Sequence, residues 1–268
     1  VTYICEMYSI GLALSLIIGI VLGLVGGGGS ILTVPLVNYF FDVNMLIATT
    51  YSLVVVAIAS SFGVLQRLKS KQIDFKKGML FVLPSMLVAF SIRKWIMPMF
   101  PIKFELNDFI LSRDIVITVF LIAVMIYTAS KTLIAKEREI DHSKTNSSAI
   151  LLFGVLTGAL SGFIGAGGGF IIVPILLRLG LNMKKAVGTS MFIISIQSAV
   201  ALIGDSFNEE ITSGGINWGL LIILTAFTVG GVYLGSVFQK HVSGNFLRKV
   251  FSWILLVVSA GLTFKVIS

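Results

Sequence analysis

Two glycine clusters are the residues of this sequence whose type and spacing best suit chemistry. They are Gly26–Gly29 and Gly165–Gly169, the second of which is interrupted by Ala166. Glycine permits sharp turns and lets a ligand approach the bare backbone. An apolar run that can form a short helix follows each cluster, and the free N–H groups at a helix N-terminus attract anions. The clusters therefore predict a site for a small anion, built largely from backbone amides.

Hydroxyl side chains lie near both clusters in the sequence and extend this candidate site. The residues expected to line it are Gly27, Gly28, Gly29, Ser30, Thr49, Thr50, Ser52, Gly167, Gly168, Gly169, Thr189 and Ser190. Hydroxyl groups hydrogen-bond to anion oxygens while staying neutral. The alternative is that these hydroxyls bond only to backbone carbonyls one turn earlier. The sequence leaves both roles open.

The remaining chemistry-bearing side chains offer no competing site. Arg93 and Arg178 lie near the ends of apolar segments, and no charged residue falls well inside the expected crossings. His142 and His241 lie in loops without clustered partners, so we expect no metal. Cys5 is a single cysteine, and neither glycine cluster completes a nucleotide-binding motif. We therefore expect no cofactor and no catalytic residues, and hence no enzyme.

The composition indicates a membrane protein. Of the 268 residues, 56% are hydrophobic and only 12% are charged, whereas soluble domains are about a quarter charged. The mean hydropathy is +1.02. Such a chain cannot cover a globular surface with water-compatible side chains, which excludes soluble enzymes and disordered proteins. The net charge of +8 comes from basic residues that lie between apolar runs and not in one patch, so we expect no nucleic-acid partner. Basic loops of this kind are typical of the cytoplasmic side of a membrane, and we expect a multi-pass protein of the cell (inner) membrane.

Apolar segments of about 20 residues divide the chain. They are 8–40, 44–66, 78–97, 114–134, 149–179, 183–204, 216–239 and 246–266. The segments 8–40 and 149–179 are too long for one crossing and contain the glycine clusters, so each is expected to enter the membrane, break and return. The polar stretch 136–148 is expected to be a cytoplasmic linker between an N-terminal repeat, 1–135, and a C-terminal repeat, 149–268.

The two halves of the chain are similar to each other. An offset of 139 residues, and of 138 after one gap, matches Gly, Pro, Asn and Ser positions, namely Gly26 with Gly165, Pro35 with Pro174, Asn44 with Asn182 and Ser52 with Ser190. An apolar bias alone would not match these residue types in register, so the pattern indicates a duplication. Each half then holds one hairpin and three crossings. Since three is odd, the second copy is inverted, as is common in secondary transporters.

Basic residues in the short loops predict the orientation of the chain. The loops 67–77, 136–144 and 184–185 are rich in Lys and Arg, whereas 205–210 is acidic. The basic loops all lie on the cytoplasmic side only if 149–179 returns to the face that it entered. The same treatment of 8–40 places the loop 98–113 outside, although it contains Lys103 and Arg113.

The glycine clusters also carry a resemblance to a known family. The stretches Gly26–Pro35 (GGGGSILTVP) and Gly165–Pro174 (GAGGGFIIVP), together with Ala186–Ser190 (AVGTS), resemble the duplicated signature of the TauE/SafE family of sulfite exporters. The resemblance covers nearly the whole chain. It implies an integral membrane permease for small anions such as sulfite, sulfonates or sulfoacetate. The first copy has Tyr51 where the second has Thr189, and this bulkier side chain bears on the size of the ligand.

The sequence therefore predicts an all-α membrane protein that transports a small anion by alternating access. Transport is driven either by an ion gradient, with a proton or sodium as the coupling ion, or by the anion's own gradient, and the sequence leaves this choice open. A passive anion channel is the alternative, although the sequence shows no pattern of the charged rings or hydrophobic gates that are typical of channels. A non-transporting subunit of a larger complex is a further alternative. Small-xxx-small glycine pairs, Gly19/Gly23, Gly158/Gly162 and Gly231/Gly235, are explained by helix packing and are also compatible with a homodimer.

Overall fold

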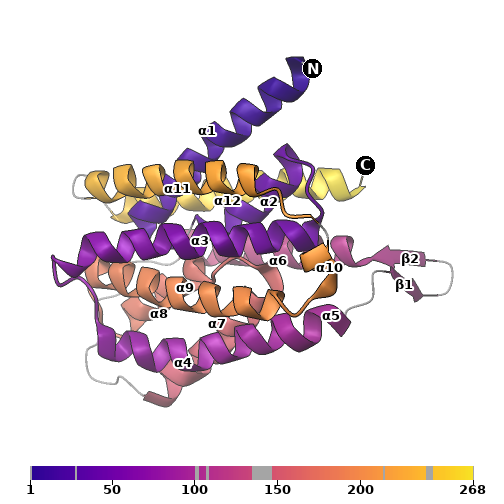
Figure 1. Ribbon diagram of the computed structural model, residues 1–268. Coiled ribbons are helices and arrows are strands. Elements are labelled where there is room, and N and C mark those ends of the chain that lie inside the picture. The colour runs from indigo at the N-terminus through magenta and orange to yellow at the C-terminus, as the bar shows by residue number, and fades with distance from the viewer. Residues whose placement is uncertain are drawn as a thin grey trace.

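The computed structural model describes residues 2–27, 29–99, 103–106, 109–134, 147–213, 215–239 and 244–267. Over these ranges the chain forms a bundle of α-helices (Figure 1). A two-stranded antiparallel hairpin lies in the loop before the last helix of the first half and pairs Lys103 with Ser112. Gly28, most of the linker 136–148 with His142, and His241 lie outside the described residues.

The elements follow the predicted segments closely. The first half contains α1 (Thr2–Val25), α2 (Ser30–Phe40), α3 (Met45–Leu68), α4 (Phe75–Ser91), the π-helical turn η1 (Ile92–Ile96), α5 (Met97–Met99), β1 (Lys103–Leu106), β2 (Phe109–Ser112) and α6 (Arg113–Ile134). The second half contains α7 (Ser147–Ile164), α8 (Gly169–Arg178), α9 (Met183–Asp205), α10 (Glu209–Ser213), α11 (Trp218–Phe238) and α12 (Gly244–Ile267).

Polar caps set the start of four of the long helices. The side chains of Asn44, Asp74, Asn182 and Asn217 each accept a hydrogen bond from a backbone N–H in the first turn of α3, α4, α9 and α11. Such caps satisfy N–H groups that have no partner within the helix. The matching positions of Asn44 and Asn182 extend the predicted duplication to the local structure.

Six helices in the described part of the chain are long and apolar enough to cross a membrane: Met7–Val25, Met45–Leu68, Phe75–Met99, Arg113–Ser130, Met183–Asp205 and Trp218–Phe238. Five of these match predicted crossings, and the remaining predicted crossing, 246–266, forms α12. The first lies in α1, the long arm of the predicted hairpin 8–40. The 24 residues of α1 measure about 36 Å at 1.5 Å per residue, so this arm alone has the length of a crossing. The membrane path of the hairpin stays a prediction.

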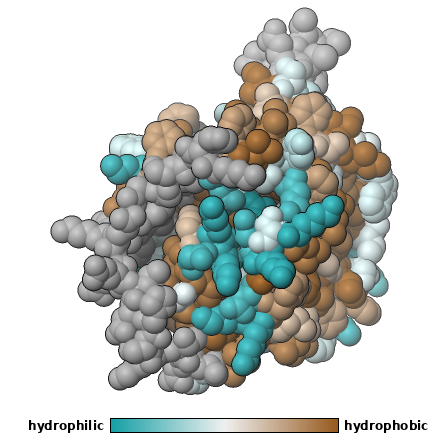
Figure 2. All heavy atoms as spheres, turned by 90° about the vertical axis from the view of Figure 1, so that its left-hand side faces the viewer, coloured by the Kyte–Doolittle hydropathy of each residue, from teal (hydrophilic) through white to brown (hydrophobic). Residues whose placement is uncertain are grey.

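The basic loops gather at one end of the bundle. The Lys77 Nζ donates a hydrogen bond of 2.7 Å to the Leu179 carbonyl, and the Asp74 N–H donates one of 2.9 Å to Thr189 Oγ1. These bonds join the start of α4 to the loop before α9 and to the first part of α9 itself. Figure 2 shows hydrophilic side chains gathered on this end of the molecule, where Lys69, Lys71, Lys76, Lys184 and Lys185 are exposed. The loops 67–77 and 184–185 therefore lie at the same end of the bundle. This arrangement is the one expected if the segment 149–179 returns to the side from which it entered.

The opposite end carries the acidic loop. Arg113 donates to both carboxylate oxygens of Glu210, at 2.8 and 2.5 Å, and Tyr51 Oη accepts a hydrogen bond of 2.7 Å from the Asn217 N–H. Arg113 is a basic residue in the loop 98–113, which the predicted orientation places outside, where basic residues are not expected. Its partnership with Glu210 offsets its charge, so its place at the acidic end has a physical reason.

The two halves pack by exchanging partners. Helix α1 lies along α11, whereas its counterpart α7 lies along α4, and α6 pairs with α12. Helices α3 and α9 pack together in opposite directions, since Thr50 near the start of α3 bonds to Asp205 at the end of α9, while Arg67 near the end of α3 contacts Met191 in the first half of α9. This antiparallel pair forms the centre of the bundle (Figure 1).

Glycines form the seams between the exchanged helices. A Cβ placed on Gly231 would lie 2.8 Å from the Cα of Gly19, and one on Gly158 would lie 2.8 Å from the Cα of Ser85. Small residues of this kind let membrane helices approach closely. The glycine pairs singled out in the sequence thus serve contacts within the chain, and a homodimer stays a prediction.

Adjacent glycines in α11 allow a matched test of this seam. A Cβ on Gly231 meets backbone atoms of α1, whereas the nearest atom to a Cβ on Gly230 is the Leu16 Cδ1, at 3.8 Å. We expect Gly231→Ala to lower the free energy of unfolding by about 1–3 kcal/mol, as overpacking does. Gly230→Ala should be neutral or slightly stabilising, because alanine favours a helix. Thermal unfolding in detergent measures both, and equal effects would contradict the seam.

Candidate functional site

Both glycine clusters interrupt a helix, as predicted. Helix α1 ends at Val25 and α2 begins at Ser30, while α7 ends at Ile164 and α8 begins at Gly169. Within the breaks, the φ angles are +118° at Gly27, +61° at Gly167 and +68° at Gly168. These values lie in the region that favours glycine. The breaks therefore depend on glycine and would be strained with any other residue.

The two breaks are in direct contact. A Cβ placed on Gly27 would lie 2.6 Å from the Cα of Gly169. One placed on Gly167 would lie 2.9 Å from the Ile194 Cγ2 and 3.0 Å from the Val56 Cγ1. Because Val56 and Ile194 are near the middle of α3 and α9, the breaks meet close to the midpoint of the two central helices.

The hydroxyl residues of the predicted site do not all face the breaks. Ser30 Oγ donates to the Gly27 carbonyl at 2.7 Å, and Ser190 Oγ donates to the Gly26 carbonyl and, at 2.9 Å, to the Val187 carbonyl. Thr49 Oγ1 donates to the Leu46 carbonyl, at 2.6 Å. Backbone bonding of this kind is the alternative that the sequence had left open.

Two threonines have hydrogen-bond partners outside the glycine breaks. Thr189 accepts a hydrogen bond from the Asp74 N–H at the basic end, and Thr50 donates to Asp205 Oδ2, at 2.8 Å, at the acidic end. Ser52 Oγ is buried and has no hydrogen-bond partner within the described residues. Binding of an anion by the predicted residues stays a prediction, but the contacts divide them into a group at the breaks and a group toward the two ends.

A buried cation that the sequence reasoning missed lies beside the second break. Arg93 is fully buried, and its Nη1 donates to Thr49 Oγ1 at 3.0 Å and to Asp205 Oδ1 at 3.2 Å. A Cβ placed on Gly165 would lie 2.6 Å from Arg93 Nη2. Arg93 lies near the end of a crossing, as the sequence indicated, but its burial beside the second break was not expected. Asp205 was expected in an exposed loop, but it ends α9 and is 1% exposed.

The π-helical turn η1 places Arg93 in the interior. The turn is followed by Pro98, which has no N–H and whose ring clashes with the carbonyl four residues earlier. A wider turn, closed by the bond from the Met97 N–H to the Ile92 carbonyl, accommodates this proline. Gly204 allows the approach to α9, since a Cβ there would lie 2.7 Å from the Arg93 Cβ. Single π turns of this kind are frequent at functional sites.

Further polar atoms surround the second break. Ser161 Oγ, Gln197 Oε1 and Ser198 Oγ are buried and have no hydrogen-bond partner among the described residues. A Cβ on Gly167 would lie 3.2 Å from Ser198 Oγ, and one on Gly168 would lie 3.7 Å from Gln197 Nε2. Buried polar atoms are normally hydrogen-bonded, to protein or to water. Their gathering at Gly167 and Gly168 favours a polar ligand or water at this break.

A second buried arginine closes the basic end. Arg67 is 3% exposed, and it donates to the Gly23 carbonyl at 2.7 Å and to Gln239 Oε1 at 3.1 Å. Gln239 Nε2 in turn donates to the Leu24 carbonyl, at 3.0 Å. These bonds tie together the ends of α1, α3 and α11 immediately before the first break.

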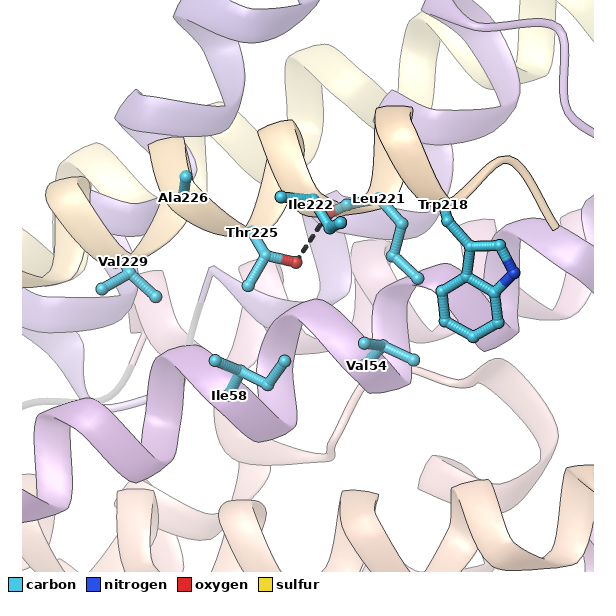
Figure 3. Close-up of a pocket in the computed structure, with 8 residues that line it drawn as sticks. All are labelled: Val54, Ile58, Trp218, Leu221, Ile222, Thr225, Ala226 and Val229. Atoms are coloured by element: carbon cyan, nitrogen blue, oxygen red, sulfur yellow. Dashed lines mark hydrogen bonds between the residues drawn. The ribbon is translucent and has the colours of Figure 1, made fainter.

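Two cavities open toward the acidic end and the flank of the bundle. One of about 410 Å³ is lined by Thr50, Tyr51 and Asp205 together with residues of the acidic loop. The other, of about 360 Å³, lies between α3 and α11 (Figure 3). Its lining is almost wholly apolar, and the hydroxyl of Thr225 donates to the Leu221 carbonyl at 2.7 Å. The first cavity is therefore the one that leads to charged groups.

Comparison with known proteins decides the family. The model of the sulfite exporter TauE/SafE family matches residues 11–262. The chain belongs to this family. A probable membrane transporter protein of Methanocaldococcus jannaschii is 29% identical to it over 259 residues, which cover 91% of this chain and 92% of the relative. No solved structure matches the chain.

Two bacterial relatives extend the similarity. The probable membrane transporter protein YunE of Bacillus subtilis is 26% identical, with 94% of this chain and 96% of YunE covered. A probable membrane transporter protein of Xylella fastidiosa is 27% identical, with 91% and 90% covered. This TauE/SafE protein is thus a multi-pass membrane transporter by its family and its relatives.

The contact between the breaks can be tested with two alanine substitutions. Both Gly27 and Gly168 have positive φ angles: alanine costs about 1–2 kcal/mol at the left-handed φ of +68° at Gly168, and more at the φ of +118° at Gly27, which lies outside the left-handed region. Only at Gly27 would the added Cβ also push against backbone, since the nearest atom at Gly168 is 3.4 Å away. We expect Gly27→Ala to lower the free energy of unfolding by at least about 1 kcal/mol more than Gly168→Ala. Unfolding in detergent measures both values, and equal losses would show that the breaks do not touch.

Proposed function

We propose that this protein is a secondary transporter that moves a small anion, such as sulfite, a sulfonate or sulfoacetate, across the cell membrane by alternating access. The observation that carries the proposal is the contact of two glycine breaks beside the buried cation Arg93. Helix α8 begins at this point, at Gly169, and its N-terminus attracts negative charge. A positive end of a helix, a guanidinium and neutral polar atoms together suit a small oxyanion.

The arrangement of the halves supports alternating access. The counterparts α3 and α9 run in opposite directions and meet at the breaks, and each half contributes one break. Inverted repeats of this kind alternate around a site at their interface. We propose that the repeats 1–135 and 149–268 rock against each other around Gly27 and Gly169, with the bonds of Arg67 closing the basic side.

The charge at the site bears on coupling. Arg93 and Asp205 form a pair without net charge, so a bound anion adds its own negative charge, which is one for a simple sulfonate and up to two for sulfite or sulfoacetate, and this charge must cross the membrane potential. One charge across 100 mV is worth about 2.3 kcal/mol. A potential that is negative inside therefore drives an uncompensated anion outward, which suits an exporter. Uptake would require a proton or sodium as the coupling ion.

The proposed role of the second break can be tested by flux. Purified protein in liposomes should move sulfite or an organosulfonate, and Gly168→Val should reduce this flux at least tenfold, because a β-branched residue is a severe outlier at a φ of +68°. Gly261→Val is the matched control, since a Cβ at Gly261 has no atom within 4 Å. Unchanged flux in Gly168→Val would refute the role of this break.

An imposed ion gradient distinguishes a passive anion channel from a coupled transporter. Liposomes with equal anion concentrations on both sides are given an imposed proton or sodium gradient, and the internal anion is followed with time. Coupled transport accumulates the anion against its own gradient. A channel moves it only with the membrane potential, and that result would favour the alternative.

A further inference from the structure

Arg93 is only partly used by its partners. Its Nη1 serves Thr49 and both oxygens of Asp205, at 3.2 and 3.3 Å. Its Nε and Nη2 are buried and have no hydrogen-bond partner among the described residues. A guanidinium binds planar carboxylates, and oxyanions generally, best through two parallel hydrogen bonds. The Arg93–Asp205 pair therefore leaves the stronger, two-pronged face of the arginine free.

The free face of Arg93 is directed toward the second break. A Cβ placed on Gly165 would lie 2.6 Å from Nη2, so the unpartnered nitrogen lies beside the backbone where α7 is interrupted. The arginine therefore lies at the second break, at whose other end Gly169 begins α8.

Asp205 lies between this site and the cavity at the acidic end. Asp205 and Thr50 line the cavity of about 410 Å³, whereas Arg93 does not. Thr50 Oγ1 donates to Asp205 Oδ2 at 2.8 Å and holds the carboxylate in place. An anion that passes between the glycine breaks and the cavity consequently passes the carboxylate.

We propose that Asp205 is a tethered competitor of the transported anion. In the closed state its carboxylate holds Arg93 through Nη1 alone, and a substrate carboxylate, sulfonate or sulfite takes the free Nε and Nη2. The two anions then share one guanidinium charge, which weakens the bond of Asp205 until its carboxylate leaves Arg93. Release of Asp205 opens the path to the acidic end, so binding and opening are one event. This inference rests on the proposed function, to which it adds the residue that contacts the anion and the group that the anion replaces.

The second ion pair at the same end of the bundle provides a matched control. Arg113 contacts Glu210 through both terminal nitrogens, at 2.8 and 2.5 Å, and the Glu210 side chain is 37% exposed. Glu210 is not among the residues that line the cavity. Glu210→Gln therefore removes a carboxylate from an arginine at the acidic end without touching the proposed site.

The test compares anion binding by the purified full-length chain in detergent, titrated with sulfite and with sulfoacetate at constant pH and ionic strength. We expect Asp205→Asn to lower the melting temperature without anion, because a buried arginine loses its counter-charge. The dissociation constant of the Asp205→Asn variant for the anion should be at least tenfold lower than that of the wild type, since the competing Asp205 carboxylate is absent. Glu210→Gln should bind within twofold of the wild type.

A double variant keeps the test decisive if Asp205→Asn does not fold alone. Arg93→Gln with Asp205→Asn removes both charges, which buried pairs often tolerate, and it should fold and show no anion-dependent stabilisation. Equal or weaker binding by Asp205→Asn than by the wild type, wild-type affinity in the double variant, or no anion binding by any variant would overturn the inference.

Flux in liposomes separates this inference from the proposed function. Sulfite flux by the wild type, combined with an unchanged dissociation constant in Asp205→Asn, would overturn the role of Asp205 and leave transport standing. Tighter binding by Asp205→Asn in a chain that moves no anion would support the displacement of Asp205 and contradict transport.

Discussion

The contact of Gly27 with Gly169 is the constraint on which the rest of the structure depends. At this point two interrupted backbones touch, and a Cβ on either residue would meet the other backbone. Lipid cannot satisfy the free N–H and C=O groups of a broken helix, so such backbone is stable only inside protein or beside water. The antiparallel pair of α3 and α9 provides that enclosure. The glycine seams of α1 with α11 and of α7 with α4 bring the long arms close enough to complete it.

Much of this fold could be predicted from the sequence, because its determinants are local. Runs of glycine placed both breaks, apolar length placed the crossings, and Asn44 and Asn182 marked the start of matching helices. The common face of the loops 67–77 and 184–185 followed from their basic residues alone. The length of α1 and the hairpin of β1 and β2 did not follow, since neither has a periodic pattern that distinguishes it.

The Arg93–Asp205 pair could not be predicted, because it depends on tertiary structure. Each residue stands at the end of an apolar segment, where a charge normally reaches water, and only the π turn before Pro98 directs Arg93 inward. The signal in the sequence was an arginine within an apolar stretch and an aspartate directly after another. Thr189 shows the converse case. It neighbours Ser190, but it faces α4 whereas Ser190 bonds to the first break.

The most direct measurement of the central claim is an experimental structure of the protein in a membrane mimetic with sulfite or sulfoacetate bound. The account predicts interrupted helices at 26–29 and 165–169, and an anion within hydrogen-bond distance of Arg93 Nη2 and of backbone N–H groups among Gly167–Gly169. Continuous helices through these stretches would contradict it. So would an anion held at the basic face by Lys184 and Lys185, with the glycine breaks empty.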